Sequence, residues 1–103
     1  MAQTVTDNAA QTRYELDVSG DRAGLIDYVT MDGACDLFHT EVDPQYAGQG
    51  LAAVLVAGAV ADLRARGLAL IPTCPYIQAW LRKNPTELDI VPPEVAQEFG
   101  LIA

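Results

Sequence analysis

Polar and apolar residues alternate through much of the first half of the chain. In the clearest case Tyr14, Leu16 and Val18 share one side of an extended segment, and charged residues share the other. A period of two is typical of a strand with one buried face. The alternation and two short turn sequences predict an antiparallel meander of three strands, over residues 13–18, 23–31 and 34–42, with turns at 19–21 and 32–33.

The hydrophobic pattern changes after the third strand. Residues 50–66 contain no proline, are rich in Ala, Leu and Val, and are followed by Gly67, where a helix commonly ends. This pattern predicts a long, largely buried helix. Leu68–Ile71 is a short apolar run before Pro72 and predicts a buried strand. Since the connection is long, we expect this strand to run parallel to the third one, which makes a βαβ unit.

A second helix is predicted to begin at Pro75, because proline suits the first helical position. Ile77, Trp80 and Leu81 have the spacing of a core stripe, and Asn84-Pro85 ends the pattern. The fold class is therefore α/β (α+β).

The predicted elements imply one domain with two flanking segments. We expect a flexible N-terminal tail over 1–12, a domain over 13–91 and a C-terminal extension over 92–103, with a short helix at 94–99. The length of 103 residues and the 50% of hydrophobic residues suit one packed domain. We expect a monomer or a weak dimer, because one small sheet with an apolar helix can stand alone.

The net charge of −8, from 14 acidic and 6 basic residues, argues against nucleic acid and anionic membranes as partners. The charge is unevenly spread: residues 1–43 carry nine acids and two bases, and residues 64–83 carry four bases and no acid. The basic stretch could hold a small polyanion or could be a solvated helix end.

The cysteines and the terminal segment favour a cytoplasmic location. Cys35 and Cys74 are too few for a disulfide scaffold, so we expect two thiols in a reducing compartment. The longest apolar run, 50–61, is too short to span a bilayer, and residues 1–11 lack the features of a signal peptide. No cysteine–histidine cluster has metal spacing, which predicts no metal.

The stretch Gln45-Tyr46-Ala47-Gly48-Gln49-Gly50 joins the third strand to the long helix. Free N–H groups and the helix dipole favour an anion at such a helix start, and glycines let a phosphate approach the main chain. The loop lacks the Lys-Ser/Thr pair of a nucleotide P-loop and the third glycine of a dinucleotide fold. On these residues alone, a plain strand-to-helix turn is the alternative.

Five blocks in one order carry a resemblance to a known family. Together with the predicted fold, the chain resembles the GCN5-related N-acetyltransferases (GNAT), and most closely their small single-domain Acetyltransf_CG type. The blocks are His39-Thr40-Glu41-Val42, Gly48-Gln49-Gly50-Leu51-Ala52, Arg64-Ala65-Arg66-Gly67-Leu68, Pro72-Thr73-Cys74-Pro75-Tyr76-Ile77 and Asn84-Pro85.

The resemblance implies an acyl-CoA N-acyltransferase fold that binds acetyl-CoA. In such a fold the third and fourth predicted strands splay apart, and the cofactor enters the splay. Its pantetheine arm would pair with the third strand, and its pyrophosphate would rest on the glycine loop. The implied cofactor-binding residues are Glu41, Val42, Gln45, Gly48, Gln49, Gly50, Leu51, Ala52, Cys74 and Lys83.

Three residues have implied catalytic roles, each with a plainer alternative. Cys74, just before the second helix, is an acyl-accepting or reactive thiol, or a small buried cap. Glu41 takes a proton from the acceptor amine, or is an exposed strand acid. Tyr76 donates a proton to the departing CoA thiolate, or packs in the first helical turn.

Two further residues are expected to be structural. By strand alternation, His39 shares a face with Cys35, and a lone histidine is more often structural than catalytic. Cys35 lies in the middle of its strand and is expected in the core.

The acceptor side is expected to be open. Larger members of the family place helices between their first two strands, whereas residues 19–22 leave no room for one. This favours a protein or peptide acceptor, and the acidic meander would attract a basic one. The function implied is an acetyl-CoA-dependent N-acetyltransferase. A non-catalytic CoA-binding interaction module and a plain structural domain remain alternatives.

Overall fold

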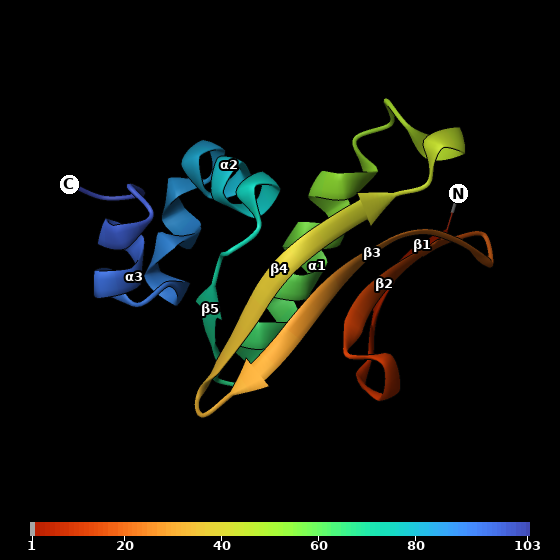
Figure 1. The fold of residues 1–103 in the computed structure, drawn as a ribbon. Helices are drawn as coiled ribbons and strands as arrows, with labels where there is room; N and C mark the ends of the chain where they lie inside the picture. Colours follow the sequence, from red (N-terminus) through yellow and green to blue (C-terminus); the bar gives the residue numbers. More distant parts are fainter. Residues whose placement is uncertain (1) are drawn as a thin grey trace.

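A five-stranded sheet in the order β1-β2-β3-β4-β5 forms the centre of the fold (Figure 1). The computed structural model describes residues 2–103. Successive strands are antiparallel except for β5, which runs parallel to β4. The strands are β1 (Gln3–Asn8), β2 (Arg13–Val18), β3 (Asp21–Met31), β4 (Ala34–Val42) and β5 (Ala69–Ile71).

Three α-helices and three short 3₁₀ helices complete the chain. The α-helices are α1 (Leu51–Ala65), α2 (Pro75–Lys83) and α3 (Pro93–Glu98), and the 3₁₀ helices are η1 (Ala9–Gln11), η2 (Pro44–Tyr46) and η3 (Pro85–Ile90). The predicted meander, the βαβ unit and the second helix are therefore confirmed.

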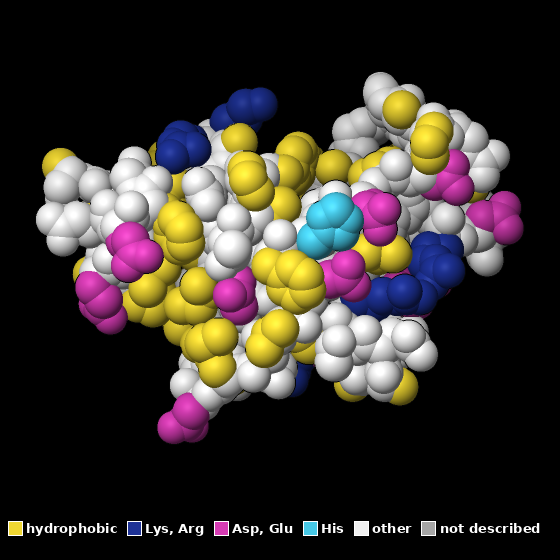
Figure 2. All heavy atoms as spheres, viewed as in Figure 1, with side chains coloured by type: hydrophobic (Ala, Val, Ile, Leu, Met, Phe, Trp, Pro, Cys, Tyr) yellow, Lys and Arg dark blue, Asp and Glu magenta, His cyan; other side chains and the backbone are white. Residues whose placement is uncertain are grey.

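Helix α1 covers one face of the sheet, and the core lies between them (Figure 1). Tyr14, Leu16 and Ile26 point from the strands into this core and meet Leu55 and Val56 of the helix in one buried cluster. Alternation then directs the intervening side chains to the opposite side, which we call the outer face. The outer face is open to solvent, and Figure 2 looks onto it.

The expectation of a flexible tail over 1–12 is wrong for the residues described, because β1 pairs with β2 over six residues. Val5 packs against α1 so closely that a Cβ on Gly58 would lie 2.7 Å from it. Asp7 accepts a 2.6 Å hydrogen bond from the Tyr28 hydroxyl. The polar residues that suggested a tail are thus partly used in tertiary contacts, while Met1 lies outside the described residues.

A β-bulge in β4 changes which side chains face the core. Asp27 is opposite His39 and Tyr28 is opposite Leu37, so Phe38 is an extra residue without a partner. The extra residue shifts the alternation by one position, and His39 becomes exposed on the outer face while Thr40 is half-buried. The expectation that His39 shares a face with Cys35 is therefore wrong.

Strands β4 and β5 separate after a short stretch of pairing. Only Ala34, Cys35 and Asp36 pair with β5, and the Cys74 N–H then donates to the Leu37 carbonyl at 3.0 Å. Within residues 2–103, the β5 side of β4 has no further backbone partner from Phe38 to Val42. The splay expected between these strands is confirmed.

The C-terminal extension packs onto the core. Ala96 of α3 is buried, and Val95 and Leu101 pack against the same cluster. Arg82 at the end of α2 also donates a hydrogen bond to the Phe99 carbonyl at 3.3 Å. In the described part of the chain, no helix combines the length and the apolar character that crossing a bilayer needs.

Candidate functional site

The glycine loop lies between β4 and α1, beside the open end of the splay. Asp43 caps η2 by accepting a hydrogen bond from the Gln45 N–H at 3.0 Å. Gly48 and Gly50 then have φ values of 79° and 71°, a region that L-residues rarely occupy. A Cβ at either position would meet nothing within 4 Å. The loop therefore presents bare main chain to open space.

The start of α1 offers N–H groups without competing acceptors. Gly50 is the N-cap and supplies no side chain, and the first turn contains no acidic residue. Unsatisfied N–H groups and the positive end of the helix dipole favour an anion at such an end. Leu51 is buried and holds the helix against the core, and Ala52 is half-buried. A phosphate group therefore fits this position by both charge and space.

Cys74 lies across the splay from β4. It is the N-cap of α2, and its Sγ lies 3.3 Å from Thr40 Oγ1. Its side chain is 5% exposed, whereas Tyr76 in the first turn is 41% exposed. The other thiol, Cys35, is buried in the core, and desolvation raises its pKa to about 11. Thr40 was not singled out from the sequence, because only the bulge turns it toward Cys74.

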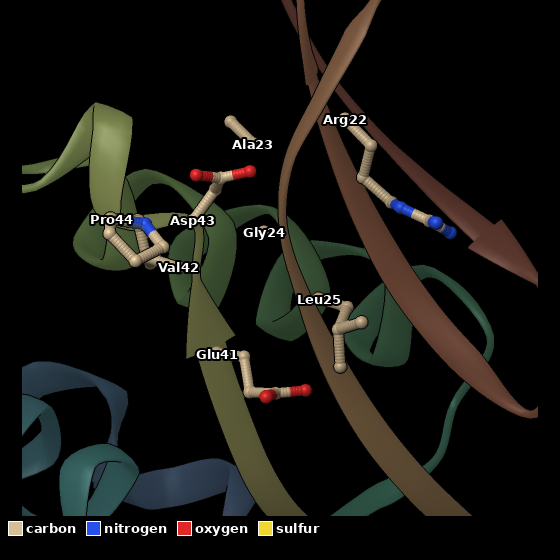
Figure 3. Close-up of a pocket in the computed structure, with 8 residues that line it drawn as sticks. All are labelled: Arg22, Ala23, Gly24, Leu25, Glu41, Val42, Asp43 and Pro44. Atoms are coloured by element: carbon tan, nitrogen blue, oxygen red, sulfur yellow. The ribbon is translucent and has the colours of Figure 1, made fainter.

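Glu41 lies on the outer face and is separated from Cys74 by the strand. Its Oε2 is 3.6 Å from His39 Nε2, and within residues 2–103 no hydrogen bond joins it to Cys74 or Tyr76. Glu41 and Val42 instead line a pocket of about 230 Å³ between the ends of β3 and β4 (Figure 3). Arg22, Gly24 and Asp43 also line this pocket.

One group of side chains on the outer face is chemically able to hold a cation. Asp27, His39 and Glu41 each place a ligand atom within 4.8 Å of the others. The sequence did not suggest this group, because the three residues meet only through the β3–β4 register and the bulge. A nitrogen with two carboxylates suits several divalent metals, and the expectation of no metal stays a prediction.

The basic stretch 64–83 does not form one cationic patch at the loop. Arg64 binds Glu87 and Asp89, and Arg66 binds Asp7 and Asp62. Lys83 lies at the last residue of α2, and Figure 1 shows this helix leading from the splay toward α3. The structure therefore brings Glu41, Val42 and the loop residues to one end of β4, and Cys74 and Tyr76 to the other side of the splay. Lys83 is the last residue of α2, and its contact with the cofactor stays a prediction.

The family model that matches the chain is described as GCN5-related N-acetyl-transferase, and the match spans residues 13–90. The chain belongs to this family. Among solved structures it is similar to the ribosomal-protein-S18-alanine N-acetyltransferase from Escherichia coli, with 25% identity and a TM-score of 0.58. That alignment covers 70% of this chain but 50% of the other, so the chain spans about half the length of that enzyme. No curated protein matches the chain.

Proposed function

We propose that the protein is an N-acetyltransferase that binds acetyl-CoA in the splay between β4 and β5 and acts on the amine of a protein or peptide. The observation that carries this proposal is the unpaired edge of β4 from Phe38 to Val42, which leads directly into the glycine loop. Family membership supports the reaction class.

The backbone suits the two halves of the cofactor. An unpaired strand edge offers main-chain donors and acceptors to an extended pantetheine arm, as an added strand would. The bare N–H groups from Gly48 to Ala52 suit its pyrophosphate, in line with the absence of an acid in the first turn of α1. In this proposal Glu41, Val42, Gln45 and Gln49 contact the cofactor through their main-chain groups.

When bound, acetyl-CoA supplies a thioester that an acceptor amine can attack. Glu41 then accepts the amine proton, directly or through water, for an acceptor that arrives from the outer face. Tyr76, exposed in the first turn of α2, donates a proton to the departing thiolate. Cys74 is placed as a reactive or acyl-accepting thiol, and the Thr40 hydroxyl at 3.3 Å orients it. Lys83, in the last turn of α2, is the cation proposed for a phosphate group of the cofactor.

A non-catalytic CoA-binding module is the second function to test. The observation that favours it is the separation of Glu41 from Cys74 and Tyr76 on different sides of β4. Such a module binds the cofactor by the same backbone but releases no CoA.

Two measurements test the proposal in turn. Acetyl-CoA at 100 times its Kd raises the unfolding free energy by about 2.7 kcal/mol, which a thermal shift assay detects. Absence of a shift at millimolar ligand removes both CoA-binding functions. Release of free CoA in the presence of amine acceptors then separates them, because only the enzyme turns over.

The catalytic assignments need variants with matched controls. Glu41→Gln is expected to slow CoA release by about 100-fold or more, the contribution of a positioned general base, and Cys74→Ala is expected to slow it as well. Glu98→Gln in α3 removes the same charge as Glu41→Gln, at an exposed site away from the sheet, and leaves the rate unchanged. Unchanged turnover in both site variants would refute the catalytic assignments while leaving the enzyme itself intact.

A further inference from the structure

The outer face combines exposed apolar side chains with carboxylates. Val29, Met31 and Phe38 are 52%, 47% and 44% exposed, and all three belong to neighbouring strands β3 and β4. Figure 2 shows apolar side chains over these strands, with acidic groups on either side of them and the histidine close by. The proposed site uses only the Glu41 end of this surface.

Two carboxylates of this face, Asp27 and Asp36, form no ion pair within residues 2–103. The two arginines of this face, Arg13 and Arg22, bind the same acid, Glu15, although Arg13 is also opposite Asp27 in the β2–β3 register. Among residues 2–103, Asp27 forms no ion pair, and Glu41 is paired only with His39. The chain's remaining arginines and its lysine follow β4 in the sequence, in or next to α1 and α2. The acids of the outer face, Glu15, Asp17, Asp27, Asp36 and Glu41, therefore outnumber its two arginines.

Asp36 adds an independent indication that a ligand is expected here. It faces outward between Val29 of β3 and Ile71 of β5, and its Oδ1 is buried without a hydrogen-bond partner. A buried carboxylate oxygen without a hydrogen-bond partner carries a free-energy cost. A cation bound on this carboxylate reduces that cost.

We propose that the outer face binds a basic, extended polypeptide segment with Lys or Arg at alternate positions, as the acceptor of the acetyl transfer. This inference rests on the proposed function. Alternate residues of an extended chain are about 7 Å apart and point the same way. Asp36 of β4 is opposite Val29 of β3, which lies two residues from Asp27, so the two carboxylates are one such repeat apart along the strand direction.

The same residues explain why a basic segment needs no apolar residues of its own. The hydrocarbon stems of Lys and Arg pack on apolar surface while their charged ends reach carboxylates. Phe38 and Val29 supply that surface, and the Phe38 ring can also attract a cation through its face. A segment bound in this way places one of its basic side chains near Glu41, the proposed proton acceptor.

Fluorescence anisotropy with a labelled nonapeptide of alternating Lys and Thr tests the inference without acetyl-CoA. We expect binding that weakens between 50 and 200 mM salt, and no binding of the matching Glu–Thr peptide. The double variant Asp27→Asn/Asp36→Asn weakens binding by about fivefold or more, since each ion pair contributes up to about 1 kcal/mol. Phe38→Ser also weakens binding.

A control of equal charge change separates a defined site from general attraction to an acidic protein. Glu94→Gln/Glu98→Gln removes two exposed acids from α3 and is expected to leave the affinity within about twofold. Equal weakening by both double variants, or equal binding of the two peptides, would overturn the inference. If the peptide binds but no CoA is released, the acetyltransferase proposal is wrong and the peptide-binding face stands. If CoA is released with simple amines but the peptide does not bind, the peptide-binding face is wrong and the acetyltransferase proposal stands.

Discussion

Gly50 and Gly67, at opposite ends of α1, form a matched pair for testing the glycine loop. Their φ values are 71° and 68°, and a Cβ at either would meet nothing within 4 Å. Alanine at either position incurs roughly 1–2 kcal/mol for the left-handed conformation. A smaller loss of freedom in the unfolded chain, roughly 0.4–1 kcal/mol, offsets part of this cost. Gly67→Ala, held between α1 and β5, should therefore lower the unfolding free energy by about 1 kcal/mol, and Gly50→Ala by less, because its loop is free to relax.

The two variants differ in their expected effect on acetyl-CoA. In Gly50→Ala the free loop relaxes out of the strained conformation, and binding must restore it, which costs about 1–2 kcal/mol or about 5- to 30-fold in Kd. Gly67→Ala leaves the Kd unchanged. Urea unfolding and calorimetric titration measure the two quantities separately. Equal acetyl-CoA affinities for the two variants would refute the role of this loop in binding.

Three further predictions concern stability and thiol chemistry. Gly58→Ala is expected to displace β1 and lower the melting temperature, because its Cβ would lie 2.7 Å from Val5, and hydrogen exchange should show β1 amides losing protection; unchanged protection would contradict this packing. Iodoacetamide at pH 8 is expected to label Cys74 before Cys35, because burial raises the pKa of Cys35 to about 11, and peptide mass mapping identifies the first site; first labelling of Cys35 would contradict it. Glu15→Gln is expected to lower stability at pH 7 but not near pH 2. The hydrogen bond from a neighbouring arginine holds the Glu15 pKa below 4.5, so its contribution is present above that pH and is lost as the pH falls through the lowered pKa. Parallel unfolding curves for the variant and the natural chain at both pH values would show that this ion pair contributes nothing.

The elements with a continuous hydrophobic period could be predicted from the sequence. Helix α1 and strand β5 follow directly from the apolar run after residue 50 and from Gly67 and Pro72. Strand β1 could not be predicted in this way, because its inward positions include Asp7, whose carboxylate is satisfied by Tyr28 and a distant arginine. A polar residue with a tertiary partner gives no local signal of burial.

In the candidate site, one extra residue in β4 makes some side-chain orientations impossible to predict from the sequence. The loop from Gly48 to Gly50 carries its own signal, because glycines before a helix need no knowledge of register. The extra residue Phe38, in contrast, moves His39 to the outer face and turns Thr40 toward Cys74. Alternation counted along the sequence misses this, since a shift of one position reverses every side chain that follows.

The ¹⁵N–¹H spectrum of the protein titrated with acetyl-CoA tests the central claim most directly. The account predicts saturable shifts of the amides from Phe38 to Val42, which line the unpaired edge of β4, and from Gly48 to Ala52, at the start of α1. Cys74 and Tyr76, across the splay, are expected to shift with them. An unchanged spectrum at millimolar acetyl-CoA, or shifts confined to other parts of the sheet, would contradict the proposed binding of acetyl-CoA between β4 and β5.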